Sequence, residues 1–189
     1  MHYFYSDPVP TNRERALDAA IELLAAGGPR ALTHARIDAA AGLPKGSTSN
    51  DFRTRSALLA GVTEAIVQRE AAGVTAALTP ASPAELVEAC CALLDIVTVQ
   101  QRTVTAARLA LFLEAAHEPA LAAPLAQGRA VLAGTVEGVL TRLGAPDARA
   151  GAAALMACFE GLILHRIARG QDGDARAAFT VAVRGALST

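Results

Sequence analysis

The chain has 189 residues, of which 52% are hydrophobic and 19% charged, and its formal net charge is −1 at pH 7. This length is enough to bury a substantial core, and the hydrophobic fraction excludes an intrinsically disordered protein. A net charge near zero also excludes a protein that is basic over its whole surface, so any contact with nucleic acid must come from a local patch.

The first predicted element is an amphipathic helix over residues 12–26, preceded by a flexible arm over 1–11. Leu17, Ile21 and Leu24 recur at helical spacing on one face, while charged residues occupy the opposite face. A Gly-Gly-Pro sequence follows and stops the helix.

A polar segment between residues 33 and 55 predicts a helix-turn-helix. Thr33 is suited to cap a short helix, and Gly42 comes where the chain must turn sharply and a left-handed backbone costs least. Small polar side chains and Lys45 then crowd a second, very short helix. Short side chains let a helix approach DNA closely, and their hydroxyls and amides reach phosphates and base edges. The segment therefore predicts a DNA reader.

Phe52 and the helix after it complete this module. We expect the Phe52 ring to fill a small core. Its expected neighbours are Leu17, Ile21 and Ile37. Thr54 is suited to cap a further helix that runs from residue 55 into the 70s. The inward face of that helix is predicted to comprise Leu58, Leu59, Val62 and Ile66.

The stretch over residues 12–66 resembles the DNA-binding domain of the tetracycline-repressor (TetR) family. The positions that carry the resemblance are Ala20, Gly28, Thr33, Ala41, Gly42, Lys45, Gly46, Ser47, Phe52, Arg55, Leu58 and Leu59. Two positions depart from the family pattern, because Ser49 and Asp51 stand where the family usually has Tyr or His. In the family those rings contact DNA phosphates, whereas the carboxylate of Asp51 repels the phosphates. We therefore expect weaker non-specific affinity for DNA.

The resemblance implies that the module binds double-stranded DNA and reads its sequence. Residues 12–55 carry seven basic and five acidic side chains, a local positive excess that suits a DNA reader. Phosphate contacts are predicted for Thr33 and Lys45, and for Arg53 or Arg55. Base contacts are predicted for Ser47, Thr48 and Asn50. The full predicted set of DNA-binding residues is Thr33, Arg36, Lys45, Gly46, Ser47, Thr48, Ser49, Asn50, Arg53 and Arg55.

After a proline-rich break at 79–83, the rest of the chain predicts helices and no strand. Pro119 and Pro124 are expected to bracket a short helix or irregular turn, while Leu109, Phe112 and Leu113 face inward. The predicted fold class is all-α with about nine helices, divided into a helix-turn-helix domain over 12–57 and a helical ligand-binding and dimerisation domain over 58–189. The helices expected in the second domain cover 83–99, 103–117, a long segment ending near 143, 148–169 and 175–187.

The last two of these helices are apolar nearly all round, so they must be buried on more than one side. Burial inside one protomer and burial in a two-fold helix-pair interface both fit this pattern. The resemblance favours the interface, and it implies a homodimer that binds a palindromic operator. The predicted interface residues are Phe159, Leu162, Ile163, Arg166, Phe179, Val183 and Leu187.

The resemblance also implies a small-molecule effector. Alanine-rich helices carry few bulky side chains, so the body has room for an internal cavity. A ligand changes DNA affinity only if it prefers one spacing of the two reading helices over another. We therefore expect a repressor that an effector releases from its operator. The predicted pocket residues are Ile66, Leu93, Arg108, Phe112, Glu114, His117 and Glu160.

An alternative function follows from Glu114 and His117, whose Glu-x-x-His spacing occurs in di-iron helix bundles. That chemistry needs a second such pair, and His165 follows Glu160 by five residues instead of three. The alternative is an all-helical metal-binding or enzymatic protein that uses these four residues. We nevertheless expect no metal, no cofactor and no enzymatic activity, because the sequence carries no phosphate loop, nucleotide fingerprint or local catalytic motif.

The remaining features bear on the compartment. Cys90, Cys91 and Cys158 lack CxxC spacing and lie in apolar runs, which predicts buried, reduced thiols. The N-terminus lacks the cationic start and apolar core of a signal peptide. The longest uncharged run, 71–84, is too short and too rich in Thr, Ser and Pro to span a membrane. We therefore expect a cytoplasmic protein without a membrane contact.

Overall fold

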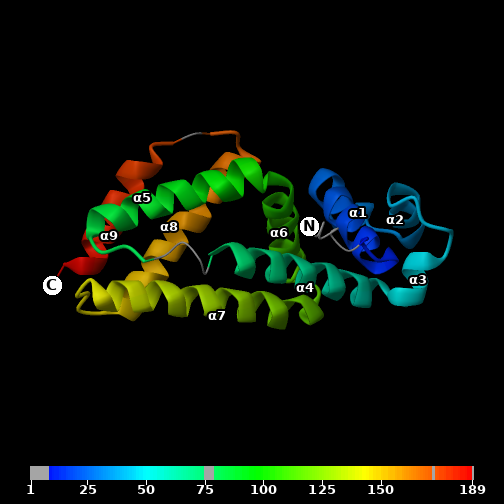
Figure 1. The fold of residues 1–189 in the computed structure, drawn as a ribbon, viewed down its shortest axis with the longest axis horizontal. Helices are drawn as coiled ribbons and strands as arrows, with labels where there is room; N and C mark the ends of the chain where they lie inside the picture. The colour runs from blue at the N-terminus through cyan, green and yellow to red at the C-terminus, as the bar shows by residue number, and fades with distance from the viewer. Residues whose placement is uncertain (1–8, 75–78, 172, 189) are drawn as a thin grey trace, which may run out of the picture.

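The computed structural model describes residues 9–74, 79–171 and 173–188, and within them the chain forms nine α-helices and no β-strand (Figure 1). A short 3-10 helix at Pro29–Ala31 and a π-helical stretch at Ile96–Gln100 join them. The all-α prediction is therefore confirmed. The helices are α1 (Asn12–Gly27), α2 (His34–Ala40), α3 (Ser47–Asp51), α4 (Arg55–Val74), α5 (Pro83–Asp95), α6 (Arg102–Glu114), α7 (Pro119–Arg142), α8 (Ala148–Ala168) and α9 (Ala175–Leu187).

The molecule is elongated, with two ends joined by long helices. In Figure 1, α1, α2 and α3 lie at one end, and α5, α8 and α9 lie toward the other. Between the two ends α4 and α7 pack against each other, while α6 packs on α1. This arrangement connects the predicted DNA reader to the helical body through α4 and α6.

Side-chain caps fix where several helices begin. The predicted caps are confirmed, because Thr33 accepts a hydrogen bond from the Arg36 amide (3.3 Å) and Thr54 accepts one from the Ala57 amide (3.1 Å). Thr11 was expected in a flexible arm, but it forms a reciprocal capping box with Glu14 at the start of α1. Residues 1–8 of the predicted arm lie outside the described residues.

The predicted break between Pro119 and Pro124 is wrong, because α7 runs unbroken with Pro124 inside it. Pro119 occupies the first turn, where an amide proton has no partner within the helix. Pro124 lacks the N–H that would bond to the carbonyl one turn earlier, so α7 gives up one hydrogen bond there. Leu121 and Leu125, on either side of Pro124, are buried in an apolar cluster, and this packing holds the helix together across the proline.

The buried face of α6 also differs from the predicted one. Leu111 is fully buried, whereas Leu113, which was expected to face inward, is 78% exposed. Leu109 and Phe112 are half-buried. Each residue of an α-helix turns the chain by about 100°. Positions two apart therefore point in nearly opposite directions, and burying Leu111 turns Leu113 outward.

Two apolar clusters form the core. The first joins α1 and α2 to α4, α6 and α7, so it crosses the domain boundary predicted at residues 57 and 58. The second joins α5, α7, α8 and α9. The largest fully buried side chains are Leu24, Leu32, Ile37, Leu58, Leu59, Ile66, Leu111 and Leu121 in the first cluster and Leu86, Leu94, Leu140 and Phe179 in the second.

Helix α8 is, among the described residues, the one helix whose length and apolar composition would suffice to cross a membrane. That criterion considers length and composition alone. In the structure α8 packs between α7 and α9, and part of it belongs to the second apolar cluster. We therefore interpret α8 as a helix of the body.

The contact between Gly61 and Phe52 gives a test of the first core. A methyl group at Gly61 would overlap the buried Phe52 ring. Gly61→Ala should therefore lower the free energy of unfolding by about 1–3 kcal/mol, as overpacking of a filled core does. Gly134 in α7 has open space around it, so Gly134→Ala should be neutral or slightly stabilising. Urea denaturation of both variants checks the expectation, which equal effects would contradict.

Candidate DNA interface and ligand cavity

Two glycines shape the turn between α2 and α3. Gly42 has a φ of 62°, and Gly46, which precedes the first residue of α3, has a φ of 94°. Residues with a Cβ atom rarely adopt this left-handed conformation. The glycines therefore let the five-residue α3 start directly after a tight turn.

Asp38 holds α3 in place from the adjacent helix α2. Its carboxylate accepts hydrogen bonds from the Gly46 amide (2.7 Å), the Thr48 amide (2.8 Å) and the Thr48 hydroxyl (2.6 Å). Burial raises the pKa of the Asp38 carboxyl, but the hydrogen bonds from Thr48 and Gly46 lower this pKa by more and hold it below its ordinary value. Sequence reasoning missed this role, because an acid in a helical run also suits a solvated face.

The Asp38 network overturns the predicted base contact of Thr48. Thr48 is fully buried, and its hydroxyl is committed to Asp38, so it positions α3 instead of facing DNA. The Ser47 hydroxyl donates to the Pro44 carbonyl (2.7 Å), and the Ser49 hydroxyl donates to the Gly46 carbonyl (2.8 Å). The predicted DNA-binding residues with exposed side chains are Thr33, Arg36, Lys45, Ser49, Asn50, Arg53 and Arg55.

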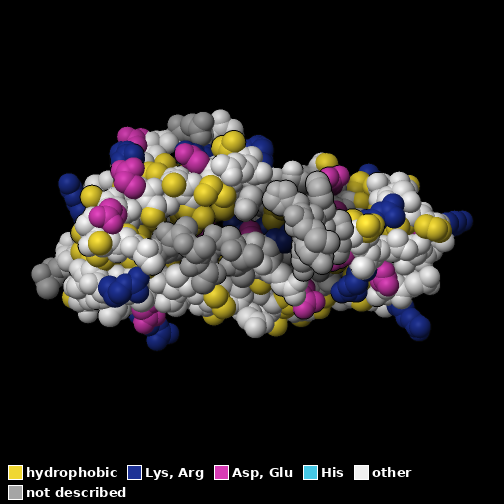
Figure 2. All heavy atoms as spheres, viewed as in Figure 1, with side chains coloured by type: hydrophobic (Ala, Val, Ile, Leu, Met, Phe, Trp, Pro, Cys, Tyr) yellow, Lys and Arg dark blue, Asp and Glu magenta, His cyan; other side chains and the backbone are white. Residues whose placement is uncertain are grey.

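Arg55 differs from the other exposed cations, because the protein itself occupies its guanidinium. Its terminal nitrogens donate to the carbonyls of Pro29 (2.9 Å) and Leu32 (3.2 Å), and one lies 3.6 Å from Glu114. The phosphate contact predicted for Arg55 is therefore replaced by a bridge between the loop before α2 and the end of α6. Figure 2 shows other basic side chains projecting from the end of the molecule that carries α2 and α3.

The Phe52 ring packs in the core beneath the helix-turn-helix of α2 and α3, as predicted. It is buried in the first apolar cluster, and the Arg13 guanidinium lies 4.7 Å from the ring centroid. The His34 Nε2 atom lies 2.6 Å from the Phe52 carbonyl, which can only accept a hydrogen bond. Phe52 is therefore fixed from both sides, and it also forms part of the wall of a cavity.

A cavity of about 780 Å³ lies between α4, α6, α7 and α8, and we call it the outer compartment. Its volume falls within the range of small-molecule sites in proteins. One end is lined by Asp51 and Phe52, so the cavity reaches from the end of α3 into the body. In Figure 2 a hollow near the middle of the molecule has basic and acidic side chains at its floor.

A second, smaller cavity of about 130 Å³ extends toward α5, and we call it the inner compartment. Apolar side chains make up most of its wall, including Leu93, Val136 and Phe159. The two compartments share a boundary formed by Glu70, Arg108, Leu132, Met156 and Glu160.

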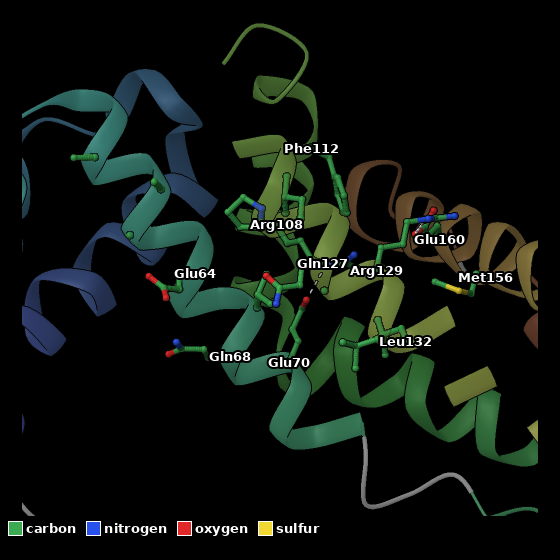
Figure 3. A pocket seen from close by; sticks show the side chains of 18 of the residues that line it. Glu64, Gln68, Glu70, Arg108, Phe112, Gln127, Arg129, Leu132, Met156 and Glu160 are labelled. Carbon is green, nitrogen blue, oxygen red and sulfur yellow. Dashed lines mark hydrogen bonds and ion pairs between the residues drawn. The ribbon is translucent and has the colours of Figure 1, made fainter. Parts of the chain in front are cut away.

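Two ion pairs lie at this shared boundary. Figure 3 shows Glu70 of α4 reaching toward Arg108 of α6, and Arg129 of α7 meeting Glu160 of α8. The Arg108 Nε atom lies 2.8 Å from a Glu70 carboxylate oxygen. Burial raises the pKa of the Glu70 carboxyl, and the Arg108 charge lowers it by less, so the pKa stays above its ordinary value. Glu70 and Arg129 were missed because sequence alone does not give the facing of α4 and α7.

The predicted pocket residues divide into two groups. Phe112, Arg108, Glu160 and Leu93 line the compartments. The other three lie elsewhere: Ile66 is fully buried in the first core, Glu114 pairs with Arg55, and His117 is exposed past the end of α6. For these three the pocket prediction is wrong. Ile66 faces the first core, and the face of α6 that carries Glu114 turns toward the start of α4.

Several predicted dimer residues lie inside the protomer. Ile163, Phe179 and Val183 are buried in the second apolar cluster, and Arg166 donates to Asp95 (2.6 Å) of the same chain. Phe159, Leu162 and Leu187 pack partly buried against that cluster. For the buried residues the prediction is wrong, because helices apolar all round do not reveal which face the protomer uses. The exposed positions of α8 and α9 include Ala153, Ala157, Gly161, Leu164, Ala177, Val181 and Gly185.

The four residues of the metal-binding alternative do not form a site. Glu114 pairs with Arg55, and Glu160 pairs with Arg129. Across the described parts of the chain, no group of three or more His, Cys, Asp or Glu side chains is placed to hold a metal ion.

Comparison with known families decides the identity of the chain. Residues 81–189, more than half of its length, match the family model described as the tetracyclin repressor-like C-terminal domain. The chain belongs to the TetR family. The family consists of transcriptional regulators, and the N-terminal resemblance and the C-terminal match point to the same one. No curated protein matches the chain in sequence.

Solved structures of transcriptional regulators and of a multidrug binding protein share the fold of this chain. A transcriptional regulator from Rhodococcus sp. Rha1 has a TM-score of 0.82 at 22% identity, covering 94% of this chain and 96% of that one. A TetR-family member from Streptomyces coelicolor A3 has a TM-score of 0.75 at 26% identity, covering 95% and 100%. The multidrug binding protein EbrR in complex with ethidium has a TM-score of 0.71 at 26% identity, covering 95% and 100%.

Removal of the Asp38 carboxylate tests whether it holds the reader. Asp38→Ala leaves two amides and the Thr48 hydroxyl without their acceptor, so we expect a loss of about 2–3 kcal/mol in the free energy of unfolding. Because the pKa of Asp38 is lowered in the fold, this stabilisation in the wild type is lost only as the pH falls below about 4. Denaturation curves across that pH range, with exposed Glu22→Ala as control, check it; equal losses would contradict it.

Proposed function

We propose that the protein is a homodimeric, sequence-specific DNA-binding regulator of transcription, released from a palindromic operator by a small molecule. The observation that carries the proposal is the construction of α3. Asp38 and Thr48 fix this short helix from inside, which leaves Ser49 and Asn50 exposed on it and Lys45 exposed just before it. A fixed, polar, short-chained surface of this kind suits entry into a major groove.

The DNA contacts divide by chemistry. Lys45, Arg36 and Arg53 are exposed cations that suit phosphates, and Thr33 adds its hydroxyl at the start of α2. Asn50 presents both a donor and an acceptor, the pair of groups that a bidentate contact with adenine requires. Asp51 is exposed at the end of α3 and opposes phosphate binding there. The resulting surface favours reading a site over coating DNA.

The proposed two-fold dimer follows from the short length of α3. One five-residue helix reads too few base pairs to select an operator, so a second copy is needed in the next major groove, about 34–36 Å away. Exposed small residues on α8 and α9 let two protomers approach closely. Leu164 and Val181 add exposed apolar side chains on the same two helices. We propose this face as the dimer interface, in place of the buried residues predicted from sequence.

The compartments support an effector site. EbrR, a solved structure similar to this chain, holds ethidium in one complex and proflavin in another. In this chain the outer compartment touches Phe52 at one end and α6 along its side. The Arg55–Glu114 pair ties the start of α4 to the end of α6, and a Ser56 hydroxyl that donates to Glu118 (3.1 Å) ties it to the residue before α7. A ligand that shifts α6 against α4 would therefore shift the reader.

The proposed role is regulatory and not enzymatic. Its partners are double-stranded DNA, a second copy of the chain and an effector that remains to be identified. Solved structures similar to this chain come from the bacteria Rhodococcus and Streptomyces, whose DNA lies in the cytoplasm, so we propose that the protein acts there.

Selection of binding sites from random DNA tests the central proposal. The selected sequences should be palindromic, and affinity should fall steeply with salt because phosphate contacts release counterions. Lys45→Ala should weaken all sequences alike and reduce the salt slope by about one. Asn50→Ala should cost about 1–3 kcal/mol at one base position and relax the preference there. Binding that is indifferent to sequence would contradict the proposal.

The proposed interface is tested by placing a charge on it. Leu164→Glu should convert the dimer to monomers, because a carboxylate would be buried without a partner in a close helix-pair contact. The control is Leu113→Glu on α6, since Leu113 is an exposed leucine away from α8 and α9. Analytical ultracentrifugation of both variants checks the expectation. A dimeric Leu164→Glu variant would place the interface elsewhere.

A further inference from the structure

The chemistry of the effector can be read from the boundary between the two compartments. The inner compartment is almost entirely apolar, and its volume is about 130 Å³. That is about four times the roughly 30 Å³ that one water molecule occupies in the liquid, enough for a short hydrocarbon chain or one ring. Because the outer compartment beyond this boundary is wider and carries the charged side chains, an occupant of both must be amphipathic.

Arg108 is the charged side chain at this boundary with unused hydrogen-bonding capacity. Only 12% of its side chain is exposed, and its guanidinium lies 5.3 Å from the centroid of the Phe112 ring. Among the described residues, its Nε is the one buried side-chain polar atom without a hydrogen-bond partner. Glu70 is close enough to pair with it by charge, but the N–H does not point at the carboxylate.

A guanidinium held in this way favours an anion over a cation. It presents five N–H donors in a planar fork that matches a carboxylate. The acids at the boundary are already neutralised, because Glu70 pairs with Arg108 and Glu160 with Arg129. An amine placed at the boundary would have to take Glu70 from Arg108 and leave that guanidinium buried without a partner, since Glu64 and Asp51, the other acids of the outer compartment, do not line the inner one. An incoming carboxylate would instead supply the acceptors that the guanidinium lacks.

We propose that the effector is an amphipathic carboxylic acid, with its carboxylate on the Arg108 guanidinium and its apolar part in the inner compartment. This inference rests on the proposed effector function and adds the chemical class of the ligand. Glu70 opposes binding of the ligand carboxylate, because its own carboxylate pairs with the same guanidinium. Burial raises the pKa of the Glu70 carboxyl, so Glu70 takes up a proton more readily than an exposed glutamate when a second carboxylate approaches.

Three probes that share one apolar group isolate the head-group preference. Phenylbutyrate, phenylbutyramide and phenylbutylamine are titrated into the full-length protein by calorimetry. The acid should bind about tenfold more tightly than the amide, because its carboxylate can form a charge-assisted bidentate contact. The amine should bind most weakly. Tightest binding of the amine, or no binding of the acid at about 1 mM, would overturn the proposal.

Variants of Arg108 and Glu70 test whether Arg108 is the source of the preference for an acid over an amide. Arg108→Gln should abolish the preference for acid over amide while leaving the affinity for the amide unchanged. Glu70→Gln should strengthen acid binding severalfold, because it removes the competing charge. Arg102→Gln, in the exposed first turn of the same helix, is the matched control and should change neither value. If Arg108→Gln does not fold, Glu70→Gln decides alone, and unchanged or weaker acid binding would overturn the proposal.

Separate experiments test whether the apolar part of the ligand binds in the inner compartment and whether the protein binds its operator. Leu155→Trp fills the inner compartment, so it should weaken all three probes alike and keep the ratio of acid to amide affinity. A change in that ratio without a common loss would place the apolar group elsewhere. Operator binding is measured without ligand by fluorescence anisotropy. Operator binding without acid binding refutes only the ligand class, whereas acid binding without sequence-specific DNA binding refutes the proposed function.

Discussion

The apolar core that α1 shares with α4, α6 and α7 is the constraint on which the rest of the structure depends. Leu24, Leu59 and Leu111, from three of these helices, are all buried in this one cluster. A protein interior is close-packed, so such a cluster moves between discrete arrangements and does not deform smoothly. The reader therefore cannot pivot as a separate domain, and any displacement of α6 or α4 is transmitted to α1.

The charged boundary of the cavity lies directly against this core. Burying an ion pair costs desolvation energy that the mutual attraction of the charges recovers only with good geometry. The Glu70–Arg108 pair falls short of that, because its hydrogen bond is not aligned. Two apolar residues would pack here at a lower desolvation cost. The presence of an imperfectly aligned ion pair next to an apolar compartment is therefore better explained by ligand binding than by stability.

Sequence reasoning succeeded where the signal was local. Caps such as Thr33 and the position of Phe52 depend on neighbours within one or two turns. It failed where the orientation of a helix decides the outcome. Thr48 and Ser49 have similar side chains, yet one is fully buried by an aspartate ten residues earlier and the other is exposed. Likewise Phe179 and Val181 are both apolar, and only packing of α9 on α5 and α8 buries the first and exposes the second.

The position of Asp51, one of the two departures from the family pattern, bears on both proposed binding sites. Asp51 ends the reading helix and also lines the outer compartment, next to the buried Phe52 ring. Under the proposed function, DNA and the ligand would therefore both approach this one short segment. Whatever factor the ligand applies to operator affinity, the operator must apply to ligand affinity, because the two binding free energies are linked. An acid at that position weakens both phosphate binding and the binding of an anion from the cavity side.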